Sequence, residues 1–588
     1  MTPGFDVENV LAELSIEEKA GLTSGANFWE LKAVERLGVP RIILTDGPHG
    51  LRLQAGDAGD LTQSKNRPAT CFPTATTLGS TWDPELVRRV GMALGRETRA
   101  AGVSVILGPG LNIKRHPLCG RNFEYIAEDP VISGHIGAAL VQGIQSEGVG
   151  ASPKHFACNS QETDRMRISA EVDERTLREI YFPAFEYVVR QAQPWTVMSA
   201  YNRVNGVFAS ENRWLLVEVL RDEWGFDGLV VSDWGAVGER PVSLAAGIDL
   251  EMPGTRGVSD AYLVREIAAG RAAEAALNQA TARVLRLISR GLPALNDPGE
   301  PNHAAHHRLA REVAAAGTVL LRNEPVGAAP LLPLASGTKV AVIGEFARTP
   351  RYQGAGSSMV NPTRLESLLD GLAELGETVA FAPGYTLELD DGGTSDEVTL
   401  RDEAVAAARQ AEVAVVFVGL PLEREAEGRD RDDISLPAAQ VALVEAVAAA
   451  QPRTVVVVAG GSVVELPWRT QVPAIMEMWL AGQAGGPALA DLLYGHQVPG
   501  GRLAETIPLR LQHTPAYGNF PGEGGKVRYG EGVLVGYRWY DYRDIPVAYP
   551  FGHGLTYTTF DYSDAVATVS GDGDNTEVSV TVNVSNTG

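Results

Sequence analysis

Short apolar runs that end at a polar residue recur through the first half of the chain. The clearest is Gly-Leu-Val-Val-Ser-Asp, from Gly228 to Asp233, which Trp234 follows. A continuous apolar run of this length is typical of a parallel strand that is buried on both faces. Because a carboxylate is costly to bury without a partner, we expect Asp233 where the strand leaves the sheet. Taken alone, such a residue is more often the N-cap of the next helix, so its role depends on the rest of the chain.

The same pattern predicts a series of strands over the first 290 residues or so, with helices between and after them. Helices are expected over 174–191 and 272–290. This alternation indicates parallel strands covered by helices. Its length and repetition fit a (β/α)8 barrel of the triosephosphate-isomerase type, in which the carboxyl ends of the strands carry the active site. The predicted strands are 41–46, 103–108, 151–156, 196–201, 228–233 and 247–252.

A second α/β pattern follows a stretch that is rich in proline, glycine and asparagine. Residues 291–302 have this composition, which is typical of a linker. A helix is expected over 306–319. Further strands are predicted at 339–344, 378–382, 413–419 and 454–460, and helices at 401–410 and 437–450. We therefore predict a barrel over 1–290, a linker over 291–315 and an α/β sandwich domain over 316–510.

The last part of the chain has a different character. Residues 511–560 are irregular and aromatic, and we expect them to pack across a domain surface. Residues 577–585 alternate strictly, as a half-buried antiparallel strand does. Since one or two strands do not form a stable sheet alone, we expect 561–588 to begin a β domain that is cut short. The alternative is that these strands extend the edge of another sheet.

The composition narrows the class of protein. With 588 residues, 44% hydrophobic and 21% charged, the chain is expected to form several globular domains. A net charge of −23 argues against nucleic acid and anionic membranes as partners. We find neither a signal-peptide pattern nor an apolar stretch long enough to span a membrane, and we expect a cytoplasmic protein. Three scattered cysteines, predicted to be buried, give no disulfide framework or metal spacing: Cys71, Cys119 and Cys158.

Several polar residues lie at or near the predicted strand ends of the first domain. In a barrel these ends converge on one rim. Charged side chains give strong hydrogen bonds to hydroxyl groups, and an aromatic face packs on the apolar side of a pyranose, so the set suits a sugar. Its members are Asp46, Arg121, Lys154, His155, Arg165, Tyr201, Asp233 and Trp234.

Hydrolysis of a glycoside requires two carboxyl groups with different roles. One must be ionised, and the other must donate a proton. Arg121, Lys154 and His155 are expected to lower the pKa of Asp233 and keep it ionised. The first domain offers no obvious proton donor. The charged run 423–431 in the second domain is either a solvated loop or a loop that delivers one glutamate across the domain interface.

Ordered motifs along almost the whole chain resemble the family 3 glycoside hydrolases, and their β-glucosidases in particular. So many motifs in one order are more specific than any short pattern. Among them are Thr45-Asp-Gly-Pro-His-Gly, Gly120-Arg-Asn-Phe-Glu, Lys154-His-Phe, Met198-Ser-Ala-Tyr-Asn, Ser232-Asp-Trp, Glu427-Gly-Arg-Asp-Arg and Pro550-Phe-Gly-His-Gly-Leu-Thr-Tyr.

The resemblance implies a retaining β-glucosidase, with Asp233 as nucleophile and Glu427 as acid/base. We choose Glu427 over Glu423 and Glu425 because only Glu427 precedes the Gly-x-Asp-Arg motif. The implied substrate is a small β-glucoside or oligosaccharide, with no cofactor and no metal. Residues 561–588 would begin a fibronectin-III-like domain. The implied sugar-binding residues are Asp46, Arg121, Lys154, His155, Arg165, Met198, Tyr201, Trp234 and, from the second domain, Ser357.

Other interpretations stay open. A β-xylosidase or an N-acetylhexosaminidase is an alternative enzyme, although the second kind carries a catalytic histidine on a loop after its Lys-His motif, and no such loop follows Lys154-His155. A binding protein that has lost its chemistry is a further alternative, against which both carboxyl groups argue. No Gly-x-Ser-x-Gly elbow supports a serine hydrolase. The spacing of His303, His306 and His307 permits a metal, but we favour surface or interdomain hydrogen bonding.

Overall fold

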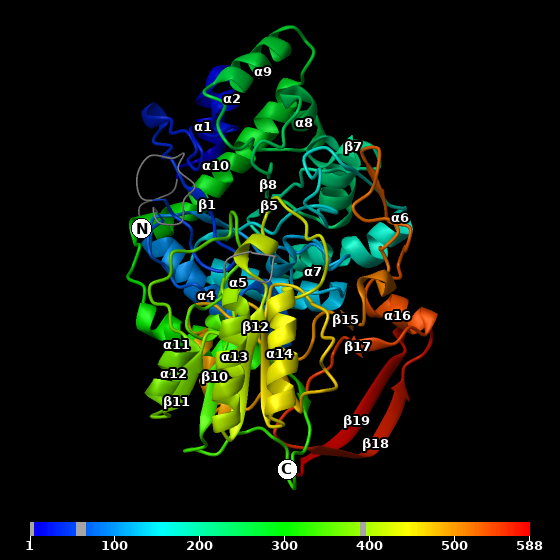
Figure 1. The fold of residues 1–588 in the computed structure, drawn as a ribbon. Coiled ribbons are helices and arrows are strands. Elements are labelled where there is room, and N and C mark those ends of the chain that lie inside the picture. The colour runs from blue at the N-terminus through cyan, green and yellow to red at the C-terminus, as the bar shows by residue number, and fades with distance from the viewer. Residues whose placement is uncertain (1–4, 55–65, 388–394) are drawn as a thin grey trace.

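The computed structural model describes residues 5–54, 66–387 and 395–588, which form an α/β protein (Figure 1). In the first part of the chain, parallel strands alternate with helices. Bridges from Phe156 to Ser199 and from Val231 to Leu250 continue the parallel pairing between the strands. The paired strands are β1 (Leu44–Asp46), β2 (Val105–Leu107) and β3 (Gly150–Ala151), then β5 (Thr196–Met198) and β8 (Leu229–Val231).

The N-terminal segment brings this pairing back to its start. Gly25 N–H donates to the Glu251 carbonyl at 3.0 Å, and Ser24 forms a parallel bridge with Glu251. Leu44 N–H of β1 donates to the Trp29 carbonyl, also at 3.0 Å. Hydrogen bonding therefore passes from β8 through residues 250–251 and 24–29 to β1, and the carboxyl ends of the parallel strands lie on the same side.

Most predicted strands of the first part are confirmed, but each is shorter than its apolar run. The expectation for Asp233 holds, because β8 ends at Val231. The predicted strand 247–252 is present only as isolated bridges at Leu250 and Glu251. The predicted helix 174–191 is divided into α6 (Glu174–Thr176), a π-helical turn η4 (Leu177–Tyr181) and α7 (Pro183–Ala192). Pro183 has no N–H to continue the helical ladder, which explains the break.

The predicted linker is shorter than its composition indicates. Helix α10 (Glu274–Asn296) continues six residues beyond its predicted end and includes Pro293 in its last turn. Its apolar face, which includes Ile288 and Gly291, is buried, and this packing outweighs the local preference of the sequence. Residues 297–302 alone form the irregular connection, and α11 (His303–Gly317) begins directly after it.

The second part is built around a six-stranded sheet, in the lower half of Figure 1. Every residue of β12 and β13 is buried, as expected for parallel strands covered on both faces. The two strands at one edge, β14 and β9, are antiparallel to each other and were not predicted. In spatial order the strands are β11 (Val379–Ala382), β10 (Val340–Ile343), β12 (Val413–Gly419), β13 (Thr454–Ala459), β14 (Ala474–Glu477) and β9 (Val319–Asn323).

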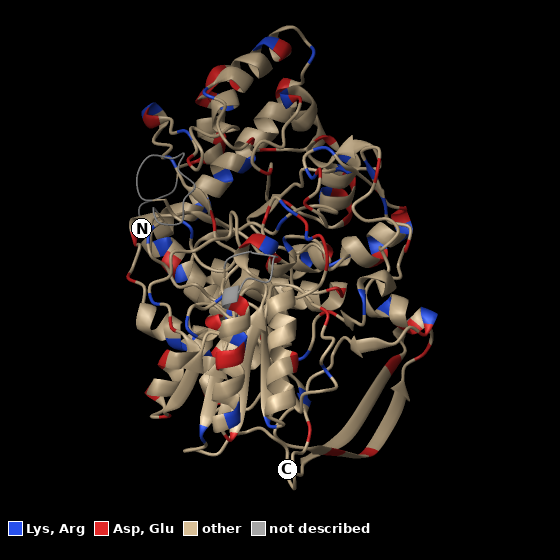
Figure 2. Ribbon diagram, in the orientation of Figure 1, with Lys and Arg blue, Asp and Glu red and all other residues tan. Residues whose placement is uncertain are grey.

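Two groups of helices pack on this sheet. One group is α13 with α14, which lie in front of the sheet in Figure 1, and the other is α15 with α11 and α12. Among the helices that the structure describes, none is both long enough and apolar enough to cross a membrane. Acidic and basic segments are interspersed along the ribbon, so the net charge of −23 is not confined to one element (Figure 2). The helices are α12 (Leu368–Glu374), α13 (Ser395–Gln410), α14 (Ala438–Ala450) and α15 (Gly485–Leu493).

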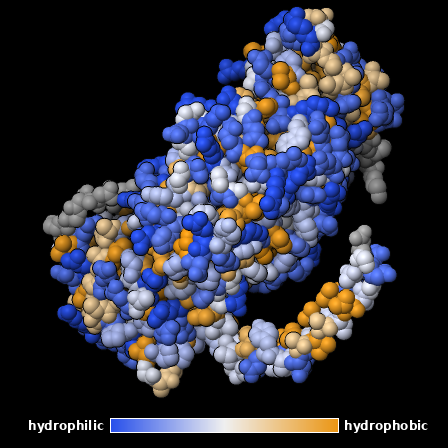
Figure 3. Space-filling view, turned by 90° about the vertical axis from the view of Figure 1, so that its right-hand side faces the viewer, coloured by the Kyte–Doolittle hydropathy of each residue, from blue (hydrophilic) through white to orange (hydrophobic). Residues whose placement is uncertain are grey.

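The last two strands form a hairpin that projects from the body of the molecule. β18 (Phe560–Ser570) pairs with β19 (Glu577–Asn586), and within the described ranges neither strand joins another sheet. All residues of β18 are exposed, and Figure 3 shows orange apolar patches among paler and blue residues along the projecting hairpin. The prediction of a half-buried strand is therefore wrong here, because no described element covers either face.

Residues 511–560 pack against the first part, as expected. β16 (Lys526–Arg528) adds in parallel to β4 (Ser169–Glu171). One ion pair also joins these regions, with Arg115 Nε 2.5 Å from Glu531 Oε1, and a second pair lies just before the segment, with Lys114 Nζ 2.6 Å from Glu505 Oε1. Their side chains are at most 4% exposed, so each charge depends on its partner from a distant part of the chain.

Replacing Lys114 with methionine should therefore destabilise the protein by about 3–5 kcal/mol, because the Glu505 carboxylate would be left without its partner. We expect calorimetry at a fixed scan rate to show a Tm lowered by several degrees. The double variant Lys114→Met/Glu505→Leu, which removes both charges, should regain most of the loss. An unchanged Tm in the single variant would contradict this account of the contact.

Candidate active site

A cavity of about 530 Å³ lies at the strand ends, where loops of the second part close over the first. Asp46 ends β1, Met198 ends β5 and Asp233 follows β8, so the sheet places all three on the same side. All the residues predicted for the site line this cavity: Asp46, Arg121, Lys154, His155, Arg165, Met198, Tyr201, Asp233, Trp234, Ser357 and Glu427.

Asp233 presents one oxygen without a hydrogen-bond partner. Its Oδ1 accepts from Trp234 N–H at 2.7 Å, whereas Oδ2 accepts no hydrogen bond from any described residue. Oδ2 lies 3.6 Å from His155 Nε2. The side chain is only 9% exposed, so this oxygen is held at the cavity with little water around it. A carboxylate oxygen in this state is available to a ligand.

The prediction that nearby cations lower the pKa of Asp233 is wrong in direction. Burial raises the pKa of Asp233, and the charges of Arg121, Lys154 and Arg165 with the Trp234 N–H only oppose this effect. His155 adds no positive charge, because burial and the adjacent arginines hold its pKa well below the usual range. The sequence showed the cations but not the depth of burial, which is the larger effect.

Glu427 is held between the two parts of the chain. Its Oε1 accepts from Arg165 Nη1 at 2.9 Å and lies 3.7 Å from Arg121 Nη1. Its Oε2 accepts from Ser357 N–H at 2.6 Å. Burial favours the neutral carboxyl, but Arg121, Arg165 and the Ser357 N–H outweigh it and bring the pKa of Glu427 well below its usual range. Among these partners Glu427 is therefore ionised.

Charged side chains also surround Asp46. Lys154 Nζ lies 3.7 Å from Asp46 Oδ1 and 3.1 Å from Glu124 Oε1, and Arg52 Nη1 lies 3.2 Å from Asp46 Oδ2. Burial raises the pKa of Asp46 to about 6, although Lys154 and Arg52 oppose it. Glu124, which is fully buried and also pairs with Arg121, was not predicted. Its position three residues after Arg121 was the feature of the sequence that could have indicated this ion pair.

Aromatic side chains form one wall of the cavity. The Trp234 indole N–H donates to the Phe28 carbonyl at 2.8 Å, and the Trp234 and Trp29 rings lie 5.5 Å apart. The Tyr201 hydroxyl donates to the Trp234 carbonyl at 3.0 Å. This wall suits the apolar face of a pyranose. The cavity residues that the sequence analysis did not assign to the site are Phe28, Trp29, Arg52, Gly235, Pro253, Gly356 and Met359.

The loop that carries Glu427 packs closely against the first part of the chain. Glu427 N–H donates to the Ala355 carbonyl at 3.0 Å, which ties the loop to its own domain. Across the interface, Gly120 N–H donates to Asp430 Oδ1 at 3.1 Å. A Cβ atom on Gly120 would lie 1.8 Å from the Arg429 carbonyl oxygen, so only glycine permits this approach.

Comparisons with known proteins agree with this architecture. Residues 30–287 match the N-terminal domain of glycosyl hydrolase family 3, and residues 318–557 match the C-terminal domain of the same family. The chain belongs to glycoside hydrolase family 3. It is 50% identical over 586 residues to the thermostable β-glucosidase B of Acetivibrio thermocellus, a match that covers 99% of this chain and 77% of that protein.

Other relatives are almost as similar. An exo-α-(1→6)-L-arabinopyranosidase of Bifidobacterium longum is 49% identical, with 98% of this chain and 76% of that protein covered. The crystal structure of a GH3 β-glucosidase from Bifidobacterium adolescentis superposes with a TM-score of 0.92 at 49% identity, covering 98% of this chain and 82% of that one. The protein is thus a glycoside hydrolase with close relatives of two substrate classes.

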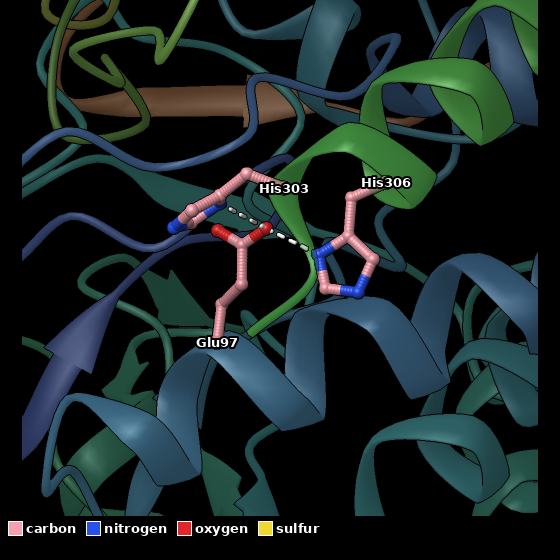
Figure 4. A group of neighbouring side chains, drawn as sticks. All are labelled: Glu97, His303 and His306. Atoms are coloured by element: carbon pink, nitrogen blue, oxygen red, sulfur yellow. Dashed lines mark hydrogen bonds and ion pairs between the residues drawn. The ribbon is translucent and has the colours of Figure 1, made fainter. Parts of the chain in front are cut away.

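The histidine cluster of this family 3 enzyme lies outside the cavity. His303 and His306, at the start of α11, point toward Glu97 of α4 (Pro84–Ala100) (Figure 4). His306 Nδ1 lies 2.6 Å from Glu97 Oε1, a hydrogen-bond distance, whereas two ligands of one tetrahedral zinc ion lie about 3.3 Å apart. Thr70 N–H and Oγ1 also donate to the Glu97 carboxylate, at 2.9 and 2.6 Å. The preference for hydrogen bonding between the two parts is confirmed for His306.

The close contact at Gly120 gives a direct test of how the loop is held. Gly120→Ala would push Arg429 and Ala426 away and displace Glu427, and a shift of about 1 Å costs on the order of 100-fold in rate. We expect kcat/KM on an aryl β-glucoside to fall by about that factor.

Gly500→Ala is the matched control, because a Cβ atom at Gly500 meets open space. This variant should keep the wild-type rate. Wild-type kcat/KM in Gly120→Ala would show that activity does not depend on this approach of the loop.

Proposed function

We propose that this enzyme is an exo-acting, retaining β-glucosidase in which Asp233 attacks the anomeric carbon while Glu427 protonates the glycosidic oxygen. Glu427 then takes a proton from water as that water attacks the glycosyl–Asp233 ester and releases the sugar. One observation carries this proposal: two carboxyl groups, one from each part of the chain, line the same cavity together with donors that suit sugar hydroxyls.

The surroundings of Asp233 support its role as nucleophile. Oδ2 lacks a hydrogen-bond donor that would weaken it as a nucleophile, and the neutral His155 beside it adds no competing charge. Burial raises the pKa of Tyr201 above its usual range, and the nearby Asp233 carboxylate raises it further. The Tyr201 hydroxyl therefore keeps its proton and stays a hydrogen-bond donor. A buried carboxylate with a free oxygen can form an ester bond with little cost of removing water.

Glu427 must both donate and accept a proton. The ionised form that Arg121, Arg165 and the Ser357 N–H favour is the form that accepts a proton from water in the second step. A bound glycoside excludes the remaining water from Glu427, which strengthens the effect of burial and raises its pKa toward that of a proton donor. Ser357, predicted to contact the sugar, holds Glu427 through its backbone N–H and so serves the same step.

The remaining residues are proposed to bind the terminal sugar. Asp46 and Lys154 form a pair of acceptor and donor for vicinal hydroxyl groups, with Arg121, His155 and Arg165 nearby. Trp234 would stack on the ring and Met198 would complete the apolar contact. A bounded cavity of this kind suits one terminal glucosyl unit, which fits exo action.

We further propose that the first domain, residues 1–290, is a (β/α)8-type barrel, which the ring of parallel pairing from β1 to β8 supports. Residues 316–510 would be the sandwich domain that supplies the acid/base. The antiparallel β18–β19 hairpin supports the beginning of a fibronectin-III-like domain over 561–588. A cytoplasmic location stays a prediction from the sequence.

Two variants separate the proposed roles. Asp233→Ala should lose nearly all activity on every glucoside. Glu427→Ala should lose about 10²–10⁴-fold on alkyl glucosides but much less on dinitrophenyl β-glucoside, whose leaving group needs little protonation.

Azide should restore Glu427→Ala by giving the β-glucosyl azide, and Asp233→Ala by giving the α-anomer, as identified by NMR spectroscopy. The opposite assignment of anomers, or equal losses on both substrates, would rule out the proposed roles.

A second candidate function is the removal of α-L-arabinopyranosyl units, because a relative named for that activity is 49% identical. Arabinopyranosides and xylosides lack the hydroxymethyl group of glucose, and the loss of such a group costs about 10–200-fold in a fitted site. We therefore expect kcat/KM on a nitrophenyl β-glucoside to exceed that on the α-L-arabinopyranoside and the β-xyloside by about tenfold or more. A faster arabinopyranoside would favour the second candidate.

A further inference from the structure

We propose that Glu162, which the acid–base steps above do not use, is a positioning residue for Glu427: it shares the side chain of Arg165 with Glu427 and holds the peptide that follows Glu427. The inference deepens the proposed function and rests on it. Glu162 lies on the loop between β3 and β4, in the first part of the chain, whereas Glu427 comes from the second part.

Arg165 joins the two carboxylates through a single nitrogen. Its Nη1 lies 2.7 Å from Glu162 Oε2 and 2.9 Å from Glu427 Oε1. A guanidinium nitrogen that serves two carboxylates cannot neutralise either one fully. Each carboxylate therefore limits how strongly Arg165 stabilises the ionised form of the other.

Glu162 also holds the backbone beside Glu427. Gly428 N–H donates to the same Glu162 Oε2 at 2.6 Å. The side chain of Glu162 is fully buried, and its Oε1 has no hydrogen-bond partner among the described residues. One carboxylate oxygen of Glu162 thus fixes both the arginine that pairs with Glu427 and the peptide next to Glu427.

The charge of Glu162 has a predictable effect on Glu427. An ionised Glu162 repels negative charge on Glu427 and raises its pKa, whereas a neutral side chain at 162 leaves Arg165 to Glu427 and lowers that pKa. Burial raises the pKa of Glu162 to about 7, against the opposing charges of Arg121 and Arg165, so this charge changes near neutral pH. The other titratable groups that interact with the pair are Asp46, Cys119, Glu124, Tyr125 and Tyr201.

Asp430 provides a matched control on the same loop. Its carboxylate accepts from the N–H groups of Gly120, Glu162 and Thr163 at 3.1, 2.8 and 2.7 Å. It therefore joins the same two loops as Glu162 does, but through backbone groups, and no hydrogen bond or ion pair links its side chain to Arg165 or Glu427 among the described residues.

The experiment compares the full-length Glu162→Gln and Asp430→Asn variants by the pH dependence of kcat. With methyl β-glucoside, the fall at high pH reports loss of the proton from the acid/base in the substrate complex. In Glu162→Gln we expect this fall to move to lower pH by about one unit, because the negative charge beside Arg165 is gone. The rate on dinitrophenyl β-glucoside should change much less. Asp430→Asn should slow both substrates by a similar factor, with a smaller pH shift.

An unmoved pH profile in Glu162→Gln, or the same shift in both variants, would overturn the inference. If Glu162→Gln does not fold, Glu162→Asp keeps the charge with a shorter side chain: kcat should fall without the acid shift, and an acid shift would overturn the inference. Glu427→Gln separates this question from the proposed function. Loss of the high-pH fall in Glu427→Gln upholds Glu427 as the acid/base, whereas its persistence would refute the proposed function itself.

Discussion

The active site depends on the burial of an ionised glutamate at the junction of two parts of the chain. Glu427 comes from the second part, and its cationic partners, Arg121 and Arg165, come from the first. A carboxylate taken out of water without such partners costs several kcal/mol. The loop that carries Glu427 is therefore stable in this position only when the two parts are packed together, and the catalytic pair exists only in that arrangement.

The same requirement explains the charges around the cavity. Arg121 pairs with both Glu124 and Glu427, and Lys154 lies between Asp46 and Glu124. Each of these two cations is thus shared by two carboxylates, so that positive and negative charges compensate one another around the cavity. Backbone contacts, such as that of Gly120 with the Glu427 loop, add the shape complementarity that charge alone does not provide.

The positions of most main strands and of cavity residues such as Asp46 and Asp233 could be predicted from the sequence, because apolar runs that end in polar residues mark the carboxyl ends of parallel strands. Met198, Ser357 and the choice of Glu427 came instead from the resemblance to family 3. The directions of the pKa shifts could not, since the sequence shows that Arg121 and Lys154 are present but not how deeply Asp233 is buried. Glu162 was missed because its contact with Gly428 comes from a distant segment, whereas Glu124 was missed although its pairing with Arg121 is local. The length of α10 and the exposure of β18 and β19 likewise depend on tertiary packing, which the local sequence pattern does not determine.

The central claim, that Asp233 forms the covalent bond to the sugar, is tested most directly by trapping. A 2-deoxy-2-fluoro-β-glucosyl fluoride should label the enzyme once, because the ring fluorine slows both formation and hydrolysis of the ester, whereas the reactive fluoride leaving group speeds up only its formation. Peptide mapping by mass spectrometry should then place the label on Asp233. A label on any other residue, or steady turnover with no covalent adduct, would contradict the account.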